Sequence, residues 1–412
     1  MSEHLHGPTR RLRVMLVTES FLPQVNGVTN SVCRAVEHLA GRGHTVEVVA
    51  PTGPASFAGA PVEHTRGVRL PLYDGFTLGV STRRSLRRSM IRFRPDIVHV
   101  ASPFLLGAAA ISAARSLGVP TVSIYQTDLV GFARNYRLSG AAPLLERMTR
   151  RVHERADRTL VPSAASESQL RALGVPRLRT WPRGVDAERF TPDRRDAGVR
   201  RRLLGTPADH AAEGDDVLVG YVGRMAREKC LHHLAAIQDL PRVRMVMVGD
   251  GPELDRLRRA LPRARFLGAR YDDELADLMA ALDVFVHPGA EETFCQAVQE
   301  AHASGVPAIG PAAGGLADRI HHGVTGLHYA RGDLPQMRAA VRRVVDDPAL
   351  RRSMGRAART AVIDRSWSVV NEALVGHYRE VVDGGVPPAG RAVRRGTPYG
   401  SPDVRRGHGL AR

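Results

Sequence analysis

Short apolar runs alternate with amphipathic stretches along most of the chain, and this rhythm constrains the fold more than any other feature of the sequence. The runs have the length of buried strands. The stretches between them have the periodicity of helices, most clearly at Asn30–Arg42 and Ala164–Leu173. Strands separated by helices predict parallel sheets that helices cover on both faces. The expected strands are Arg13–Thr18, Thr45–Ala50, Asp96–Ala101, Thr121–Tyr125, Thr159–Val161, Val217–Val222, Arg244–Val248, Arg265–Leu267, Val284–His287 and Pro307–Ile309.

The rhythm is interrupted near Trp181–Asp186, where Pro182 and Gly184 disfavour any regular element. A chain of 412 residues is also long for a single core. We therefore expect an α/β protein with two doubly wound domains, and a polar surface loop at Thr206–Asp216. The expected division is residues 1–185 and 186–365 for the two domains, 366–385 for a C-terminal helix, and 386–412 for a disordered basic tail.

The chain is strongly basic, with 59 lysine and arginine residues against 42 aspartate and glutamate residues and a formal charge of +17. A positive charge of this size attracts phosphates, nucleic acids and anionic lipids alike, so it selects no partner by itself. Lysine occurs once, as Lys229, and all the other residues counted in that basic total are arginine.

Three cysteines, Cys33, Cys230 and Cys295, are too widely spaced for a disulfide framework or a zinc site. The histidine pairs His232-His233 and His321-His322 are adjacent residues whose side chains diverge, so we expect no metal site. No apolar stretch approaches the roughly 20 residues of a bilayer-spanning helix, and the start of the chain lacks the apolar core of a signal peptide. We therefore expect a cytoplasmic protein with reduced cysteines, neither secreted nor membrane-spanning.

Two common nucleotide-binding motifs are missing from the sequence. Residues 249–254 lack the third glycine of the dinucleotide-binding fingerprint, and no Walker loop occurs. These absences disfavour a dehydrogenase and an ATPase. In open α/β sheets, ligands bind beyond the carboxyl ends of the strands, so the loops that follow the strands are the places to examine.

One such loop is Gly223–Lys229, directly after the expected strand Val217–Val222. Arg224 offers a planar guanidinium and Lys229 a compact ammonium, and two cations on one loop could clamp a diphosphate. A solvated surface loop is the alternative for most arginine pairs in so arginine-rich a chain. The single lysine argues against that alternative, because a chain that uses arginine elsewhere would keep lysine where arginine cannot serve. A stray lysine left by coding chance is the remaining alternative.

A second loop, Glu292–Glu300, follows the expected strand Val284–His287. We expect Thr293 to cap a helix whose free N–H groups form an anion site. Glu292 would lie at the mouth of this helix and Glu300 about two turns into it. One carboxylate could then accept hydrogen bonds from the hydroxyls of a sugar, and the other could accept them from the hydroxyls of a ribose. The alternative is that the Glu292 carboxylate merely complements the helix dipole, but this alternative does not explain why Glu300 lies inside the helix.

At these positions the chain resembles the GT-B retaining glycosyltransferases of the glycogen-synthase-like superfamily. The shared pattern is Glu-x7-Glu after a strand, with Gly-Arg-x4-Lys upstream. It extends over about residues 12–382. The segments Glu292–Gln296 and Tyr125–Asp128 are, more narrowly, similar to the GDP-mannose-dependent α-mannosyltransferases of bacterial lipoglycan synthesis. Further matches are Pro23-x3-Gly27, Gly184-Val185-Asp186, Gly249-Asp250-Gly251-Pro252 and Phe266-Leu267-Gly268.

The resemblance implies a GT-B fold, in which two Rossmann-like domains face a central cleft. The first is the acceptor-side domain, to which the helix 366–385 returns, and the second binds the nucleotide-sugar donor. Arg224 and Lys229 would neutralise the leaving diphosphate without a metal, and Lys229 is the residue whose loss should stop the reaction. Glu292 would bind mannose hydroxyls and Glu300 the ribose diol. The other donor-binding positions that the resemblance implies are Gly27, Gly223, Arg270, Thr293, Phe294 and Cys295.

Two positions depart from the pattern of the resembled family. Many relatives have a histidine near the sugar where this chain has Gln126. Glutamine cannot transfer protons at neutral pH, but it can hydrogen-bond a hydroxyl. Asp128 would orient the acceptor hydroxyl or cap a helix. The hinge has Arg183 where relatives often have asparagine.

Residues 83–94 predict a basic amphipathic helix in the acceptor-side domain. Such a helix suits an anionic membrane surface, and lipid-glycosylating relatives carry a comparable patch. A solvated helix face that packs its apolar residues on its own sheet is the equal alternative. The expected membrane patch consists of Arg83, Arg84, Arg87, Arg88 and Arg92.

The sequence therefore predicts a metal-independent, retaining glycosyltransferase with no cofactor other than its nucleotide-sugar donor. We expect transfer of mannose from GDP-mannose to a lipid-linked acceptor, of the phosphatidylinositol mannoside or glycosyl diacylglycerol type, at the inner face of the plasma membrane. A UDP-hexose transferase that makes a glycolipid or a soluble glycoside is the nearest alternative. A basic nucleic-acid-binding protein is a remote one, because aromatic residues are only 5% of the chain and are not interleaved with the basic stretches.

Overall fold

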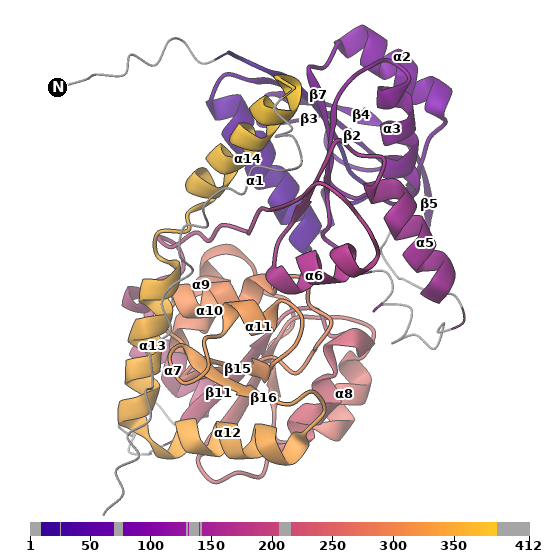
Figure 1. Cartoon of the computed structure of the whole chain (residues 1–412). Helices are drawn as coiled ribbons and strands as arrows, with labels where there is room; N and C mark the ends of the chain where they lie inside the picture. The colour runs from indigo at the N-terminus through magenta and orange to yellow at the C-terminus, as the bar shows by residue number, and fades with distance from the viewer. Residues whose placement is uncertain are drawn as a thin grey trace, which may run out of the picture.

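In the part of the chain that it describes, the computed structural model contains two large, mainly parallel sheets, each with helices on both faces (Figure 1). It describes residues 10–24, 26–69, 77–128, 131, 140, 142–205 and 216–384. The loop expected at Thr206–Asp216, apart from its last residue, and the tail expected at 386–412 lie outside these residues. Within the described ranges, no helix has both the length and the apolar character needed to cross a bilayer.

The first sheet has eight strands in the order β10-β9-β8-β7-β1-β2-β4-β3. Its neighbouring strands run parallel except for the short β3, which pairs antiparallel with β4. A separate antiparallel hairpin consists of β5 (Arg66–Arg69) and β6 (Thr77–Val80). The strands of the sheet are β1 (Arg13–Val17), β2 (Thr45–Ala50), β3 (Ser56–Phe57), β4 (Ala60–His64), β7 (Ile97–Val100), β8 (Thr121–Ile124), β9 (Arg158–Val161) and β10 (Leu178–Thr180).

Alternate residues of the central strand β1 face two different cores. Val14 and Leu16 pack into the core that lies under α1 and α14, whereas Met15 and Val17 pack into the core under α2 and α3. This is the period of two that a strand imposes on its side chains, and both faces are apolar because helices cover both. The helices of this domain are α1 (Gly27–Gly41), α2 (Arg83–Phe93), α3 (Leu105–Arg115), α5 (Ala142–His153), α6 (Ala164–Ala172) and α14 (Trp367–Val382).

The second sheet has six parallel strands in the order β13-β12-β11-β14-β15-β16. The strands are β11 (Val217–Val222), β12 (Val243–Val248), β13 (Arg265–Phe266), β14 (Val284–Val286), β15 (Ala308–Pro311) and β16 (Gly326–Tyr329). The helices around it are α7 (Ala197–Leu204), α8 (Leu254–Ala260), α9 (Asp272–Ala281), α10 (Gln296–Ala303), α11 (Leu316–Arg319), α12 (Leu334–Asp346) and α13 (Pro348–Val362). Short 3-10 turns lie at η2 (Pro192–Arg194), η3 (Arg227–Lys229) and η4 (Leu231–Ala236).

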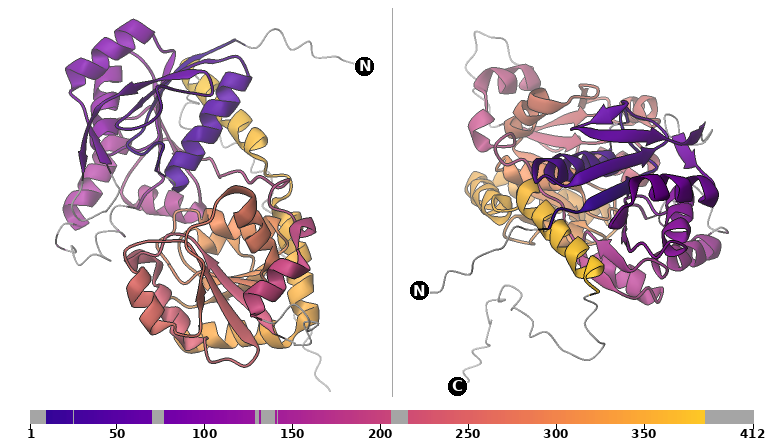
Figure 2. Two further views of the ribbon diagram at one scale, coloured as in Figure 1. Left: turned by 180° about the vertical axis from the view of Figure 1, so that it is seen from behind. Right: turned by 90° about the horizontal axis from the view of Figure 1, so that it is seen from above.

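Helix α14 crosses back from the second domain and lies along α1 of the first (Figures 1 and 2). Its residues Leu374 and Tyr378 are fully buried in the first core. The hinge strand is fixed to the start of α14, because Val185 forms a parallel bridge with Ser366. The chain therefore passes between the domains twice, at the hinge and just before α14, and both passages lie side by side.

The strand order places the carboxyl ends of β11 and β14 next to each other, although β12 and β13 intervene in sequence. This is the topological switch point of the second sheet, where open α/β sheets bind their ligands. The loops predicted to carry the chemistry follow these two strands. At the junction of the domains, α6 of the first domain contacts α11 of the second, and the backbone N–H of Ala164 donates to Asp318 Oδ2 at 2.5 Å.

Candidate active site

The loops after β11 and β14 meet through an ion pair between Lys229 and Glu292. Nζ of Lys229 lies 2.5 Å from Oε1 of Glu292, and both side chains are mostly buried. Burial alone would lower the pKa of Lys229, but the carboxylate that faces it raises that pKa. Burial would likewise raise the pKa of Glu292, whereas Lys229 and His287 hold it well below its usual value. Both groups are therefore charged at neutral pH.

His287 is a second partner of Glu292, and the sequence did not reveal it. Its Nε2 lies 3.0 Å from Glu292 Oε1, and its side chain is 3% exposed. The backbone N–H of Gly289 donates to His287 Nδ1 at 3.2 Å. Because Nδ1 accepts this bond, Nε2 carries the proton and donates to the carboxylate. One Glu292 oxygen thus receives donors from both sides.

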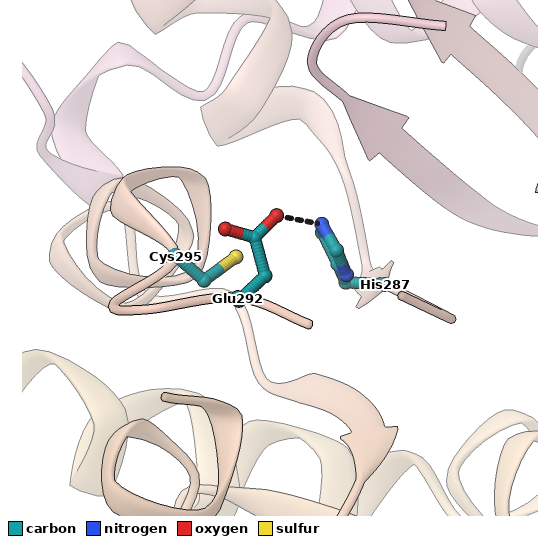
Figure 3. Close-up of side chains that lie close together, drawn as sticks. All are labelled: His287, Glu292 and Cys295. Atoms are coloured by element: carbon teal, nitrogen blue, oxygen red, sulfur yellow. Dashed lines mark ion pairs between the residues drawn. The ribbon is translucent and has the colours of Figure 1, made fainter. Parts of the chain in front are cut away.

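Cys295 completes the only group of three metal-binding side chains found in the described part of the chain (Figure 3). The ligand atoms of His287, Glu292 and Cys295 all lie within 4.8 Å of one another. The Lys229 ammonium, however, already neutralises the Glu292 oxygen that a metal would bind. A divalent cation there would be repelled by the ammonium at close range, so the donor set fits a metal poorly.

Arg224 lies on the same loop as Lys229, two residues after the end of β11. The hydroxyl of the buried Tyr221 donates to the Arg224 carbonyl at 3.0 Å, which fixes the backbone at this point. Burial lowers the pKa of Arg224, but the guanidinium is charged at neutral pH. The structure therefore places two cations, Arg224 and Lys229, on the loop at the switch point.

The loop that carries Glu292 is shaped by two glycines that the sequence motifs did not single out. A Cβ on Gly315 would lie 2.6 Å from the backbone N and Cα of Phe294, and Gly314 has a φ of +53°. The N–H of Gly315 also donates to the Glu292 carbonyl at 2.6 Å. Phe294 is 2% exposed and packs under the guanidinium of Arg319. Only glycine lets the two backbones approach so closely.

Helix α10 begins at Gln296, two residues later than the sequence pattern predicts. Cys295 has a φ of +69° and therefore cannot be helical. Thr293 does not cap the helix, because its Oγ1 donates across the domain junction to the backbone carbonyl of Gln126 at 3.0 Å. The expected role of Thr293 as N-cap is therefore wrong, and the residue instead connects the two domains.

Glu300 lies on α10, which faces the hinge. Burial raises its pKa to about 7, while a hydrogen bond from Gln296 and the charge of Arg34 act in the opposite direction. Arg34 belongs to α1 of the first domain and lies 3.7 Å from Asp186 of the hinge. The structure thus places Glu300 at the domain junction, on the same helix whose entry loop carries Glu292.

On the first domain, the residues that face this junction follow β1 and β8. Gly27 is the first residue of α1, and a Cβ built on it would meet nothing within 4 Å, so open space lies beside its backbone. Gln126 is 9% exposed, and its Nε2 donates to the Ala101 carbonyl at 2.9 Å. Asp128 Oδ1 accepts the N–H of Gly131 at 2.9 Å, which is the geometry of the capping alternative.

Two groups of predicted site residues lie elsewhere. The Arg270 guanidinium pairs with Glu274 at 3.1 Å and lines a separate hollow of about 250 Å³. Its side chain is therefore not part of the Lys229–Glu292 cluster, and the contact that the resemblance implies between its backbone and the base stays a prediction. Of the expected membrane patch, Arg92 turns to Glu47 and Glu63, at 2.9 and 2.6 Å. The remaining four residues line an open hollow of about 460 Å³ together with Ile91, and they are Arg83, Arg84, Arg87 and Arg88.

Comparisons with known proteins agree with this architecture. The family model for Glycosyltransferase Family 4 matches residues 25–189, and that for Glycosyl transferases group 1 matches residues 206–361. A sucrose-phosphate synthase structure from Thermosynechococcus elongatus superposes with a TM-score of 0.72 over 91% of this chain and 100% of that one, at 22% identity. This likeness concerns the fold alone.

Two curated relatives are much more similar in sequence. A GDP-mannose-dependent alpha-mannosyltransferase of Mycobacterium tuberculosis is 46% identical over 90% of this chain and 97% of its own length. A protein of the same description from Corynebacterium glutamicum is 41% identical over 90% of each chain. The chain therefore belongs to the family of two-domain GT-B glycosyltransferases that contains these GDP-mannose-dependent alpha-mannosyltransferases.

Proposed function

We propose that the chain transfers mannose from GDP-mannose to a lipid-linked acceptor, with retention of the α configuration and without a metal ion. The assignment of GDP-mannose as donor is supported by the names of the relatives, which are 41–46% identical to this chain. The acceptor would be of the phosphatidylinositol mannoside or glycosyl diacylglycerol type. The observation that carries the proposal is the buried Lys229–Glu292 pair at the switch point of the second sheet.

The charges of this site suit a departing nucleoside diphosphate. Lys229 and Arg224 would stabilise the negative charge that appears on the β-phosphate as the bond between that phosphate oxygen and the anomeric carbon breaks. The acceptor oxygen would attack the same face of the sugar, and its proton would pass to the leaving phosphate oxygen. Glu292, held by Lys229 and His287, would bind sugar hydroxyls through its remaining lone pairs. Two fixed cations supply the charge that a metal would otherwise provide.

The test of this proposal is a transfer assay with the purified full chain. GDP-mannose and UDP-glucose are each incubated with EDTA, with and without vesicles of a polar lipid extract from Mycolicibacterium smegmatis, a source of one of the relatives. We expect release of GDP, but not UDP, that the vesicles stimulate and that leaves mannose on a lipid product. Release of nucleotide only from UDP-glucose, or only when a divalent metal is added, would contradict the proposal.

We also propose that α2 attaches the protein to the inner face of the plasma membrane. The helix carries Arg84 and Arg88 on an exposed face beside Ile91, whose side chain is 54% exposed. Its other face is buried, with Leu86 and Met90 at 1% exposure. Exposed basic and apolar side chains on one helix face are typical of binding to anionic lipid surfaces.

A flotation experiment tests this attachment. The wild type should float with vesicles that contain anionic lipid and not with purely zwitterionic ones. The double variant R84E/R88E should float much less, while the control R342E/R343E, which reverses two exposed arginines on α12 of the second domain, should float like the wild type. A reduction of the same size in both variants would show that binding depends on the overall charge of the protein and not on α2. Flotation of R84E/R88E equal to that of the wild type would show that α2 does not bind the membrane.

A further inference from the structure

The two positions that depart from the family pattern, Gln126 and Arg183, are hydrogen-bonded to each other. Arg183 is 6% exposed, and its guanidinium donates to Gln126 Oε1 and to the Gly27 carbonyl. Burial lowers the pKa of Arg183 to about 10, so the group is still a cation at neutral pH. Both its hydrogen-bond partners are uncharged, and the charge that acts on it in the opposite direction to burial is that of the Glu292 carboxylate.

The partners on either side of Gln126 fix which way its amide points. A guanidinium can only donate, so Arg183 requires the carbonyl oxygen Oε1 on its side. A backbone carbonyl can only accept, so Ala101 requires the amino group Nε2 on its side. Both neighbours demand the same orientation. The bond to Ala101 uses one of the two N–H groups of Nε2. The second N–H can therefore donate a hydrogen bond to a ligand.

Arg183 also connects the two domains at this point. Its backbone carbonyl accepts a hydrogen bond from Gln299 of α10 at 2.8 Å, while its side chain reaches the first domain. The backbone carbonyl of Gln126 accepts the bond from Thr293 of the donor-side loop. Position 126 is therefore held by two residues, Arg183 of the hinge and Thr293 beside Glu292.

We propose that Arg183 is a positioning residue for sugar transfer, which locks Gln126 with its Nε2–H available to an oxygen atom of the bound sugar nucleotide. The proposal rests on the proposed function, because it assigns the locked amide to the sugar nucleotide of that reaction. Loss of the guanidinium frees the amide to rotate and leaves buried polar groups unpaired. Loss of the Gln126 side chain removes the contact between the amide and the sugar nucleotide, which loss of Arg183 already weakens. The reductions in activity caused by the two substitutions should therefore not multiply.

The test is a double-mutant cycle on the release of GDP from GDP-mannose in the presence of the lipid vesicles used above. R183M and Q126A should each lower kcat/KM about 10- to 100-fold, which is the range expected when a buried polar group loses its partner. The double variant R183M/Q126A should be no slower than the slower single variant. R183K should recover little, because an ammonium cannot reach Gly27 and Gln126 with the fork of an arginine.

A matched control separates positioning from general stabilisation. Arg359 on α13 donates to the carbonyls of Phe190 and Ala303 at 2.8 and 2.7 Å, and Ala303 is at the end of α10 that is farther from the Glu292 loop. R359M should lower the melting temperature and leave kcat/KM of the folded enzyme close to that of the wild type. Two outcomes would overturn the role of Arg183 but not the proposed function. One is that the losses of kcat/KM in R183M and Q126A multiply in the double variant, and the other is that the loss in R183M is no larger than that in R359M. A wild type with no turnover of GDP-mannose would overturn the proposed function and this inference together.

Discussion

Lys229 Nζ lies 2.5 Å from Glu292 Oε1, so the single lysine of the chain is paired with the first carboxylate of the Glu-x7-Glu motif. The two residues are 63 positions apart and belong to different loops. Sheet order explains the encounter, because β11 and β14 are neighbours and their carboxyl ends open on the same side. The pair links the group expected to stabilise the leaving diphosphate to the group expected to hold the sugar.

Replacement of Lys229 by alanine should reduce kcat by about 100- to 1,000-fold, the loss typical of one preorganised charge-stabilising group. It also leaves the Glu292 carboxylate without its cation, so the pKa of Glu292 should rise. Initial-rate measurements with GDP-mannose test the first effect. K229R should remain strongly impaired despite its charge, because the guanidinium is larger and planar. Wild-type turnover in K229A would show that Lys229 has no part in the reaction.

His287 should matter through Glu292 and not through contact with the substrate. In H287A the carboxylate loses the donor at 3.0 Å, and we expect kcat/KM to fall about tenfold, in line with a hydrogen bond to a charged group. H287Q retains an N–H donor and should recover part of the loss. A fall in H287A that H287Q does not relieve at all would indicate that the imidazole acts in some other way. Melting temperatures of both variants serve as the control for folding.

The fold was largely predictable from the sequence. All ten expected strands are present, and the bounds of Thr45–Ala50 and Val217–Val222 are identical to those of β2 and β11. Parallel strands buried on both faces give continuous apolar runs, which are easily recognised. Strands β3, β4, β10 and β16 and the hairpin β5–β6 were not expected, because strands of two to five residues have too little apolar pattern to recognise.

The sequence could single out the loop residues of the site, but it could not predict which partners their side chains contact. Thr293 resembles a helix cap in sequence, and only the first domain, which supplies the Gln126 carbonyl, diverts it. Arg92 belongs to the basic helix pattern, and only the folded sheet brings Glu47 and Glu63 to it. Each of these outcomes depends on a partner far away in the sequence. Local patterns cannot contain that information.

Two glycines of the site should respond to alanine in opposite ways. In G315A the new Cβ would meet the Phe294 backbone at 2.6 Å, so we expect a loss of about 1–3 kcal/mol of stability and a displaced Glu292 loop. In G27A the Cβ meets no protein atom within 4 Å, and the fold should keep or gain up to about 1 kcal/mol. If phosphates approach Gly27, G27A should still bind GDP several-fold more weakly. Thermal unfolding and calorimetric titration with GDP measure both effects, and unchanged GDP affinity in G27A would separate Gly27 from the donor site.

Donor affinity should fall as the pH drops through about 7, because the pKa of Glu300 is raised from 4.5 to about 7. Below that pH the carboxyl is protonated and accepts hydrogen bonds from a ribose diol less well than the carboxylate. The Kd for GDP, measured by calorimetry between pH 5.5 and 8.5, should therefore rise on the acidic side, and E300Q should bind weakly at every pH with a flat profile. The free protein should behave in the opposite sense: its stability should decrease as the pH rises from 4.5 to about 7, since the unfolded chain releases the Glu300 proton first. A wild-type profile as flat as that of E300Q would mean that Glu300 does not contact the nucleotide.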